Sequence, residues 1–209
     1  MKRILALGLL AGAAVQASAQ EPSAGYVGAN WGVSSNYALS CYPTLDCDRN
    51  TSRSGKIYAG YTLGTSKVFG GLSNTSAIEL SVFAAGGAYG YLPRWDTALM
   101  QARYKMQGLA VTHASALMLT DSLGLDSRLG LAYTRGSAEF PDLWTQKDYG
   151  SRYSYHHYRL GVTAGAGLSY ALNRSWTMHA DYDYVPVKYA DETGNSHVNM
   201  WSVGAAYHF

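Results

Sequence analysis

Residues 25–35 read GYVGANWGVSS. Within them Val27, Ala29, Trp31 and Val33 fall at every second position, and the residues between them are Gly, Tyr and Asn. An apolar residue at every second position is the pattern of a β-strand with one apolar face. The stretch therefore predicts a strand rather than a helix.

The same period of two returns in seven further segments that are bounded by turn residues. We expect strands at residues 25–35, 55–64, 76–86, 101–114, 123–135, 155–171, 175–185 and 198–209. In each, one face is apolar and the other carries Gly, Ser, Thr and charged residues. A soluble, lipocalin-like barrel would turn the apolar faces inward. Because the charged residues share a face with the glycines, the sequence favours a narrow barrel with a polar interior and a lipid-facing exterior.

The predicted fold class is all-β, an eight-stranded antiparallel up-and-down transmembrane β-barrel. The connection at residues 65–75, which contains Val68 and Phe69, is longer than the other inner turns, so a ten-stranded barrel is the alternative. The long polar connections are expected to be outer loops, and they lie at residues 36–54, 87–100, 136–154 and 186–197. An even number of strands then places both termini on the periplasmic side.

The start of the chain has the features of a secretory signal peptide. A basic pair precedes an apolar run, and residues 17–19 (Ala-Ser-Ala) supply a small-x-small cleavage site. We expect residues 1–19 to be removed and residues 20–209 to form one transmembrane barrel domain. Removal takes two of the 16 basic residues and leaves 14 basic against 14 acidic. This balance excludes a nucleic-acid binder driven by net charge.

Composition points to the cell outer membrane. Charged residues make up 14% of the chain, against roughly 25% in an average soluble domain. Beyond residue 19, no apolar run approaches the roughly 20 residues of a spanning helix. An exported chain that is poor in charge and has no such helix is expected to cross the membrane as a closed barrel.

The two cysteines, Cys41 and Cys47, lie in the first predicted outer loop. Because exported proteins mature in an oxidising compartment, we expect a disulfide that closes a small loop. A metal site there would need further Cys or His nearby, and the sequence offers none.

Six stretches, taken in order, resemble the OmpA-like transmembrane domain and its relatives among small outer-membrane barrels. They are residues 26–32 (YVGANWG), 59–61 (AGY), 77–80 (AIEL), 107–109 (QGL), 128–135 (RLGLAYTR) and 201–209 (WSVGAAYHF). The resemblance implies outer-membrane lipid, lipopolysaccharide and the outer-membrane insertion machinery as partners. The last stretch resembles the signal read by that machinery, carried by Trp201, Val203, Tyr207 and Phe209.

Relatives also carry a four-residue polar cluster inside the barrel. Glu79 fills the first of those slots, but the other three fall on Ala114, Ser169 and His179. The salt-bridge switch that the cluster forms in some relatives is therefore not implied for this chain.

The alternation also predicts a polar layer inside the barrel. Asn30, Glu79, Arg128 and Asp181 are expected to point inward at one depth, with His179 one step lower as the second cation. The series His179-x-Asp181-x-Asp183 could be a metal site or an interior hydrogen-bond network, and the second interpretation is favoured. We therefore predict no cofactor and no metal, and a layer that plugs the lumen.

Two functions of different classes remain. The first is a structural anchor whose outer loops meet an extracellular ligand or a host surface, and the second is a small porin-like channel for ions or small solutes. An outer-leaflet lipid-modifying enzyme comes third, based on Ser154-x-His156 and Glu139 at the outer rim. No catalytic residue is predicted, and the chain is expected not to be an enzyme.

Overall fold

The computed structural model describes residues 25–35, 51–93, 99–139, 154–189 and 196–209. Among these residues, eight antiparallel strands follow one another around a closed ring. They are β1 (Gly25–Ser35), β2 (Ser52–Lys67), β3 (Ser73–Pro93), β4 (Leu99–Met118), β5 (Leu123–Glu139), β6 (Ser154–Ala171), β7 (Trp176–Val187) and β8 (Ser196–His208). The ring closes where β8 pairs with β1, from Tyr26 opposite His208 to Ser35 opposite Asn199. The predicted eight-stranded up-and-down barrel is confirmed.

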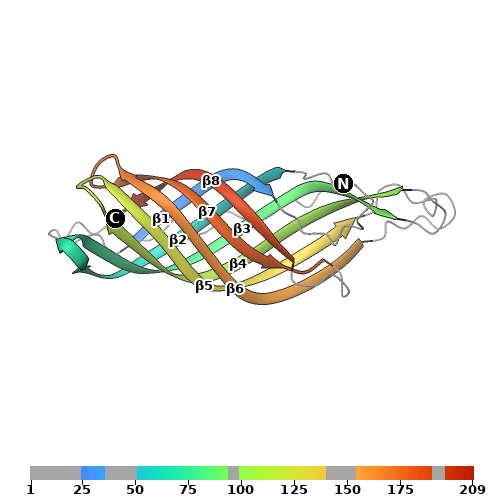
Figure 1. Ribbon diagram of the computed structural model, residues 1–209, viewed down its shortest axis with the longest axis horizontal. Helices are drawn as coiled ribbons and strands as arrows, with labels where there is room; N and C mark the ends of the chain where they lie inside the picture. The colour runs from blue at the N-terminus through green and yellow to red at the C-terminus, as the bar shows by residue number, and fades with distance from the viewer. Residues whose placement is uncertain (1–24, 36–50, 94–98, 140–153, 190–195) are drawn as a thin grey trace.

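The barrel has two unlike ends (Figure 1). At the short-turn end, β2–β3, β4–β5 and β6–β7 are joined by tight connections, and the chain finishes there. The loop end is where the strand ends are joined through residues 36–50, 94–98, 140–153 and 190–195, whose structure is not described. Within the described residues, no helix is long and apolar enough to cross a membrane.

The ten-stranded alternative is wrong, because the long connection between β2 and β3 is an extension of their own hairpin. The ladder continues past the apolar part of both strands, with Thr65 opposite Thr75 and Lys67 opposite Ser73. A short 3₁₀ turn, η1 (Phe69–Gly71), then closes it. Gly70 and Gly71 both have positive φ, a backbone conformation that glycine adopts without strain.

Several strands are longer than their alternation predicts. The largest difference is β3, expected at residues 76–86 and found at Ser73–Pro93. Some of the added rungs, such as residues 73–75 on β3 and 65–67 on β2, carry polar residues on both faces, so they contribute no apolar alternation to detect. Backbone pairing in a hairpin does not need such alternation and continues through them.

The barrel has its apolar side chains outside and its polar ones inside. Trp31, Ile57, Leu160 and Val203 all point outward and are more than 60% exposed. Near the short-turn end the exterior carries aromatic side chains, with Trp176 and Tyr207 in ring contact at 5.2 Å. An apolar band bordered by aromatic residues is the exterior of a transmembrane barrel.

Candidate functional site

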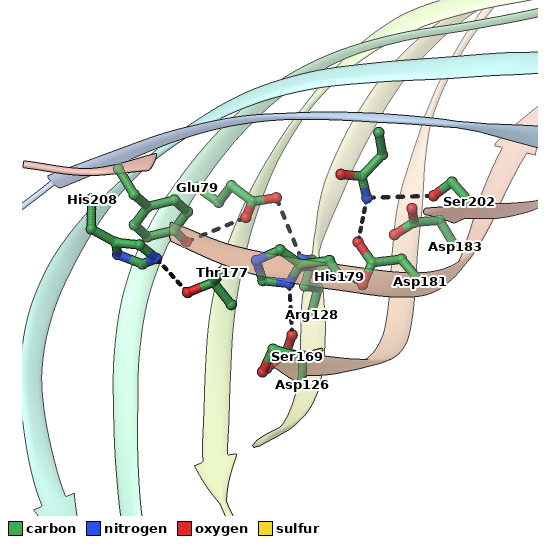
Figure 2. Close-up of polar contacts among 12 residues, drawn as sticks. Glu79, Asp126, Arg128, Ser169, Thr177, His179, Asp181, Asp183, Ser202 and His208 are labelled. Atoms are coloured by element: carbon green, nitrogen blue, oxygen red, sulfur yellow. Dashed lines mark hydrogen bonds and ion pairs between the residues drawn. The ribbon is translucent and has the colours of Figure 1, made fainter. Parts of the chain in front are cut away.

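The middle of the lumen is crossed by a network of buried charged side chains (Figure 2). Arg128 on β5 lies between two carboxylates. Its Nη1 is 3.0 Å from Asp181 Oδ1 on β7, and its Nε is 3.5 Å from Glu79 Oε1 on β3. On β1, Asn30 donates a hydrogen bond of 2.6 Å from Nδ2 to Asp181 Oδ2. The structure thus brings together the four side chains that the alternation places at one depth.

The structure adds a cation to this layer, Lys56, which the sequence-based expectation did not include. Lys56 Nζ lies 2.6 Å from Asp183 Oδ2 and 3.6 Å from Asp181 Oδ2. The cause is the register of β1 and β2, which places Lys56 directly opposite Asn30 and hence at the depth of the network.

His179 lies one step nearer the short-turn end, where it meets a further carboxylate. Its Nδ1 is 3.1 Å from Oδ2 of Asp126 on β5. The other oxygen of Asp126, Oδ1, accepts a hydrogen bond of 2.9 Å from Ser169 on β6. Figure 2 shows this pair beside the Arg128 network.

Sequence reasoning omitted Lys56 and Asp126 from the interior, and it named Asp183 only in the series His179-x-Asp181-x-Asp183 and not in the layer. Each carries a usable signal, because it lies on the inward face of its strand. Asp126 precedes Arg128 by two residues, and Asp183 follows Asp181 by two. What the sequence does not supply is the register between strands, which decides which inward residues meet.

Glycines on the inner faces make room for two large rings. Tyr58 on β2 passes over Gly28, where an added Cβ would lie 2.5 Å from the tyrosine hydroxyl. A Cβ at Gly60 would overlap the ring of Tyr26 in the same way. Because of this space, Tyr26 can donate a hydrogen bond of 3.3 Å to Glu79 Oε2.

Toward the loop end, the lumen above the charged layer is filled with apolar side chains. They form one buried cluster of Phe83, Ala85, Tyr104, Met106, Ala110, Ala132, Ala138, Val185, Val187, Tyr189, Val198 and Met200. Between this cluster and the charges there is a void of about 20 Å³, lined by Lys56, Phe83, Asp183 and Met200 among others.

Toward the short-turn end, the lumen opens into a cavity of about 280 Å³, which we call the vestibule. Tyr26, Tyr58, Asp126, His179 and His208 are among the residues that line it. The charged layer therefore separates a filled half of the lumen from an open half.

The residues considered for an enzyme lie on the exterior at the loop end. Ser154 Oγ is 3.1 Å from His156 Nε2, and Glu139 is paired with Ser154 across β5 and β6. However, both carboxylate oxygens of Glu139 accept hydrogen bonds from Lys105 Nζ, at 2.7 and 2.8 Å. Its carboxylate is thus held by a lysine in this arrangement and is not oriented toward His156 by any contact within the described residues.

The predicted C-terminal signal lies on the last strand. Trp201, Val203 and Tyr207 point outward from β8, and Phe209 donates a backbone hydrogen bond of 3.1 Å to Gly25. The predicted disulfide between Cys41 and Cys47 and the predicted signal peptide lie outside the described residues.

Three solved structures with this fold show how widely the architecture is shared. Neisserial surface protein A is 15% identical, with a TM-score of 0.57, 90% of this chain covered and 98% of that one. Ail, the attachment invasion locus protein of Yersinia pestis, is 16% identical, with a TM-score of 0.53 and coverage of 90% and 100%. OprG from Pseudomonas aeruginosa is also 16% identical, with a TM-score of 0.53 and coverage of 90% and 97%.

Sequence comparison gives the family. No curated protein sequence matches the chain. The family model described as the outer membrane protein beta-barrel domain matches residues 4–209, which is nearly the whole sequence. With its closed eight-stranded ring, apolar exterior and charged interior, the chain belongs to the outer membrane protein beta-barrel domain family.

Proposed function

We propose that the barrel is a closed outer-membrane anchor and that its loop end faces the cell exterior and makes the functional contacts. One observation supports this proposal: the loop-end half of the lumen is packed with buried apolar side chains. The void above the charged layer measures about 20 Å³, and a single water needs about 10–15 Å³. A path for ions or solutes would have to displace both the buried apolar cluster and the paired charges.

The orientation belongs to the same proposal. Three strand connections at the short-turn end are tight, as periplasmic turns are in barrels of this class. Both Gly25 and Phe209 lie at that end, joined by a backbone hydrogen bond. We therefore place both termini in the periplasm and the undescribed loop segments outside the cell.

Two kinds of partner fit a barrel in this orientation. On the exterior near the loop end, two cationic side chains are partly exposed on the neighbouring strands β4 and β5: Arg135, and Lys105, whose Nζ is also paired with Glu139. Such cations suit the phosphates of lipopolysaccharide in the outer leaflet. The loop segments would then meet an extracellular ligand or a host surface, a role in keeping with Ail, whose name describes attachment and invasion.

Planar-bilayer conductance of the refolded barrel tests the closed lumen. We expect the unmodified protein to give at most brief, small current steps. Removing two side chains that line the void, with Phe83→Ala and Met200→Ala, should increase the openings. The matched control is Val82→Ala with Val203→Ala, which removes exposed side chains from the lipid face and should leave the currents as they were. A large, steady current through the unmodified barrel would overturn the proposal and favour the porin-like channel.

A further inference from the structure

The charged layer and the residues around it carry more negative than positive charges. Among the described residues, four buried carboxylates are grouped there, on Glu79, Asp126, Asp181 and Asp183. Two basic side chains, Lys56 and Arg128, face them. With His179 neutral, the group has a formal charge of −2.

An uncompensated charge of this size is costly in a buried site, because buried ions cost several kcal/mol each unless they are paired. Protonation of His179 would supply one positive charge. A single divalent cation would supply two, and would bring the formal charge of the group to zero.

Three of these side chains already form a set of metal donors. One ligand atom each from Asp126, His179 and Asp181 lies within 4.8 Å of the other two. Zinc binds imidazole nitrogen and carboxylate oxygen at about 2.0–2.2 Å, so tetrahedral ligands lie about 3.4 Å apart. Asp126 Oδ2 and His179 Nδ1 are 3.1 Å apart. To bind a zinc ion, the site would therefore mainly need Asp181 to move toward this pair.

The surrounding contacts resemble the support that protein metal ligands usually have. Ser169 donates a hydrogen bond to Asp126 Oδ1, and Asn30 donates one to Asp181 Oδ2. Hydrogen bonds of this kind orient ligating carboxylates and commonly accompany them in metal sites.

Two unpartnered polar atoms lie beside the cluster. His179 Nε2 is buried and has no hydrogen-bond partner among the described residues. The hydroxyl of Tyr58, a residue only 2% exposed, has none either. The ring of Tyr58 meets that of His179 edge to face at 6.3 Å, and both residues line the vestibule. A water on an ion at this position could give the Tyr58 hydroxyl a hydrogen-bond partner.

We propose that Asp126, His179 and Asp181 form a binding site for a divalent transition-metal ion of the zinc class, which enters through the vestibule. The vestibule provides access, because its cavity of about 280 Å³ is lined by both Asp126 and His179. Imidazole and carboxylate ligands together select zinc and its first-row neighbours over calcium and magnesium. This proposal does not depend on which end of the barrel faces the periplasm.

The test is a calorimetric titration of the refolded full-length barrel, in detergent micelles, with zinc chloride. We expect one saturable site per chain, and Asp126→Asn or His179→Gln should weaken it at least tenfold. With Co²⁺ in place of Zn²⁺, the visible absorption of the bound ion should appear in the unmodified protein and be lost in both variants. The matched controls are His113→Gln, outside the cluster, and Cys41→Ser with Cys47→Ser, which removes thiol ligands.

Folding of each variant is checked by the mobility of unboiled samples on a gel. If Asp126→Asn fails to fold, His179→Gln alone decides the outcome, because its amide keeps the size and polarity of the site. Absence of saturable binding by the folded, unmodified barrel would overturn the proposal. Binding that persists unchanged in folded His179→Gln would also overturn it, since the ion would then sit at another place on the chain.

Discussion

Replacing Lys56 by methionine should destabilise the barrel more than replacing the carboxylate that it contacts. Lys56 Nζ lies 2.6 Å from Asp183 Oδ2, and Lys56 is only 5% exposed. Removing one partner of a buried ion pair costs about 3–5 kcal/mol, because the other charge stays buried without compensation. The charge imbalance also grows, because Lys56→Met takes the formal charge of the group from −2 to −3.

The matched variant is Asp183→Asn, which changes the charge in the opposite direction. The amide oxygen can still accept a hydrogen bond from Lys56, and Lys56 keeps Asp181 at 3.6 Å. We expect a cost of about 1–2 kcal/mol, the range for weakening one buried hydrogen bond. The double variant should be less destabilised than Lys56→Met alone, because it restores the formal charge of −2.

The assay is urea unfolding of the refolded barrel in lipid vesicles, followed by tryptophan fluorescence and by the mobility of unboiled samples. The free energies of unfolding of the unmodified protein, the two single variants and the double variant form a double-mutant cycle. The reasoning about charge imbalance would be refuted if Asp183→Asn lowered the free energy of unfolding as much as Lys56→Met. It would also be refuted if adding Asp183→Asn to Lys56→Met gave no recovery.

Three further predictions concern assembly and the first loop. Deleting Phe209 removes an aromatic ring and the backbone hydrogen bond to Gly25, so the amount of folded barrel in outer-membrane fractions should fall several-fold; an unchanged amount would contradict the assembly signal. Cys41 and Cys47 should react with a membrane-impermeant thiol reagent on intact cells only after reduction, and labelling without a reductant would show free thiols. Replacing both by Ser should leave the unfolding midpoint within a few tenths of 1 M urea of the unmodified value, because the link would brace a loop and not the sheet.

The sequence was sufficient for the fold because the decisive signal is local. In β1, the outward series Val27, Ala29, Trp31 and Val33 can be read without knowing any other strand. Ladders that continue through polar residues, such as Thr65 opposite Thr75, leave no such signal. Strand number and order were therefore predictable, and the ends of the strands were not.

The interior network was predicted less completely because it depends on register between strands. Alternation shows that Lys56 points inward, but its depth relative to Asn30 follows from the pairing of β1 and β2. The same holds for Asp126 and His179, which meet across the lumen from β5 and β7. Whether a residue points inward can be read from its own strand, whereas its partner across the lumen depends on how the strands pair around the ring.

Closure of the lumen and the charge of its middle layer are separable properties. The loop-end half is packed with apolar side chains such as Phe83, Met106 and Met200, and under the proposed anchor function this packing blocks ions without any buried charge. Closure therefore does not require the excess of carboxylates next to the vestibule. Because Asp126 and His179 lie on the vestibule side of the layer, Asp126→Asn and His179→Gln should weaken zinc binding at least tenfold and leave the lumen closed. Phe83→Ala with Met200→Ala should increase the channel openings and leave zinc binding unchanged. The proposed anchor function and the proposed metal site can therefore fail independently.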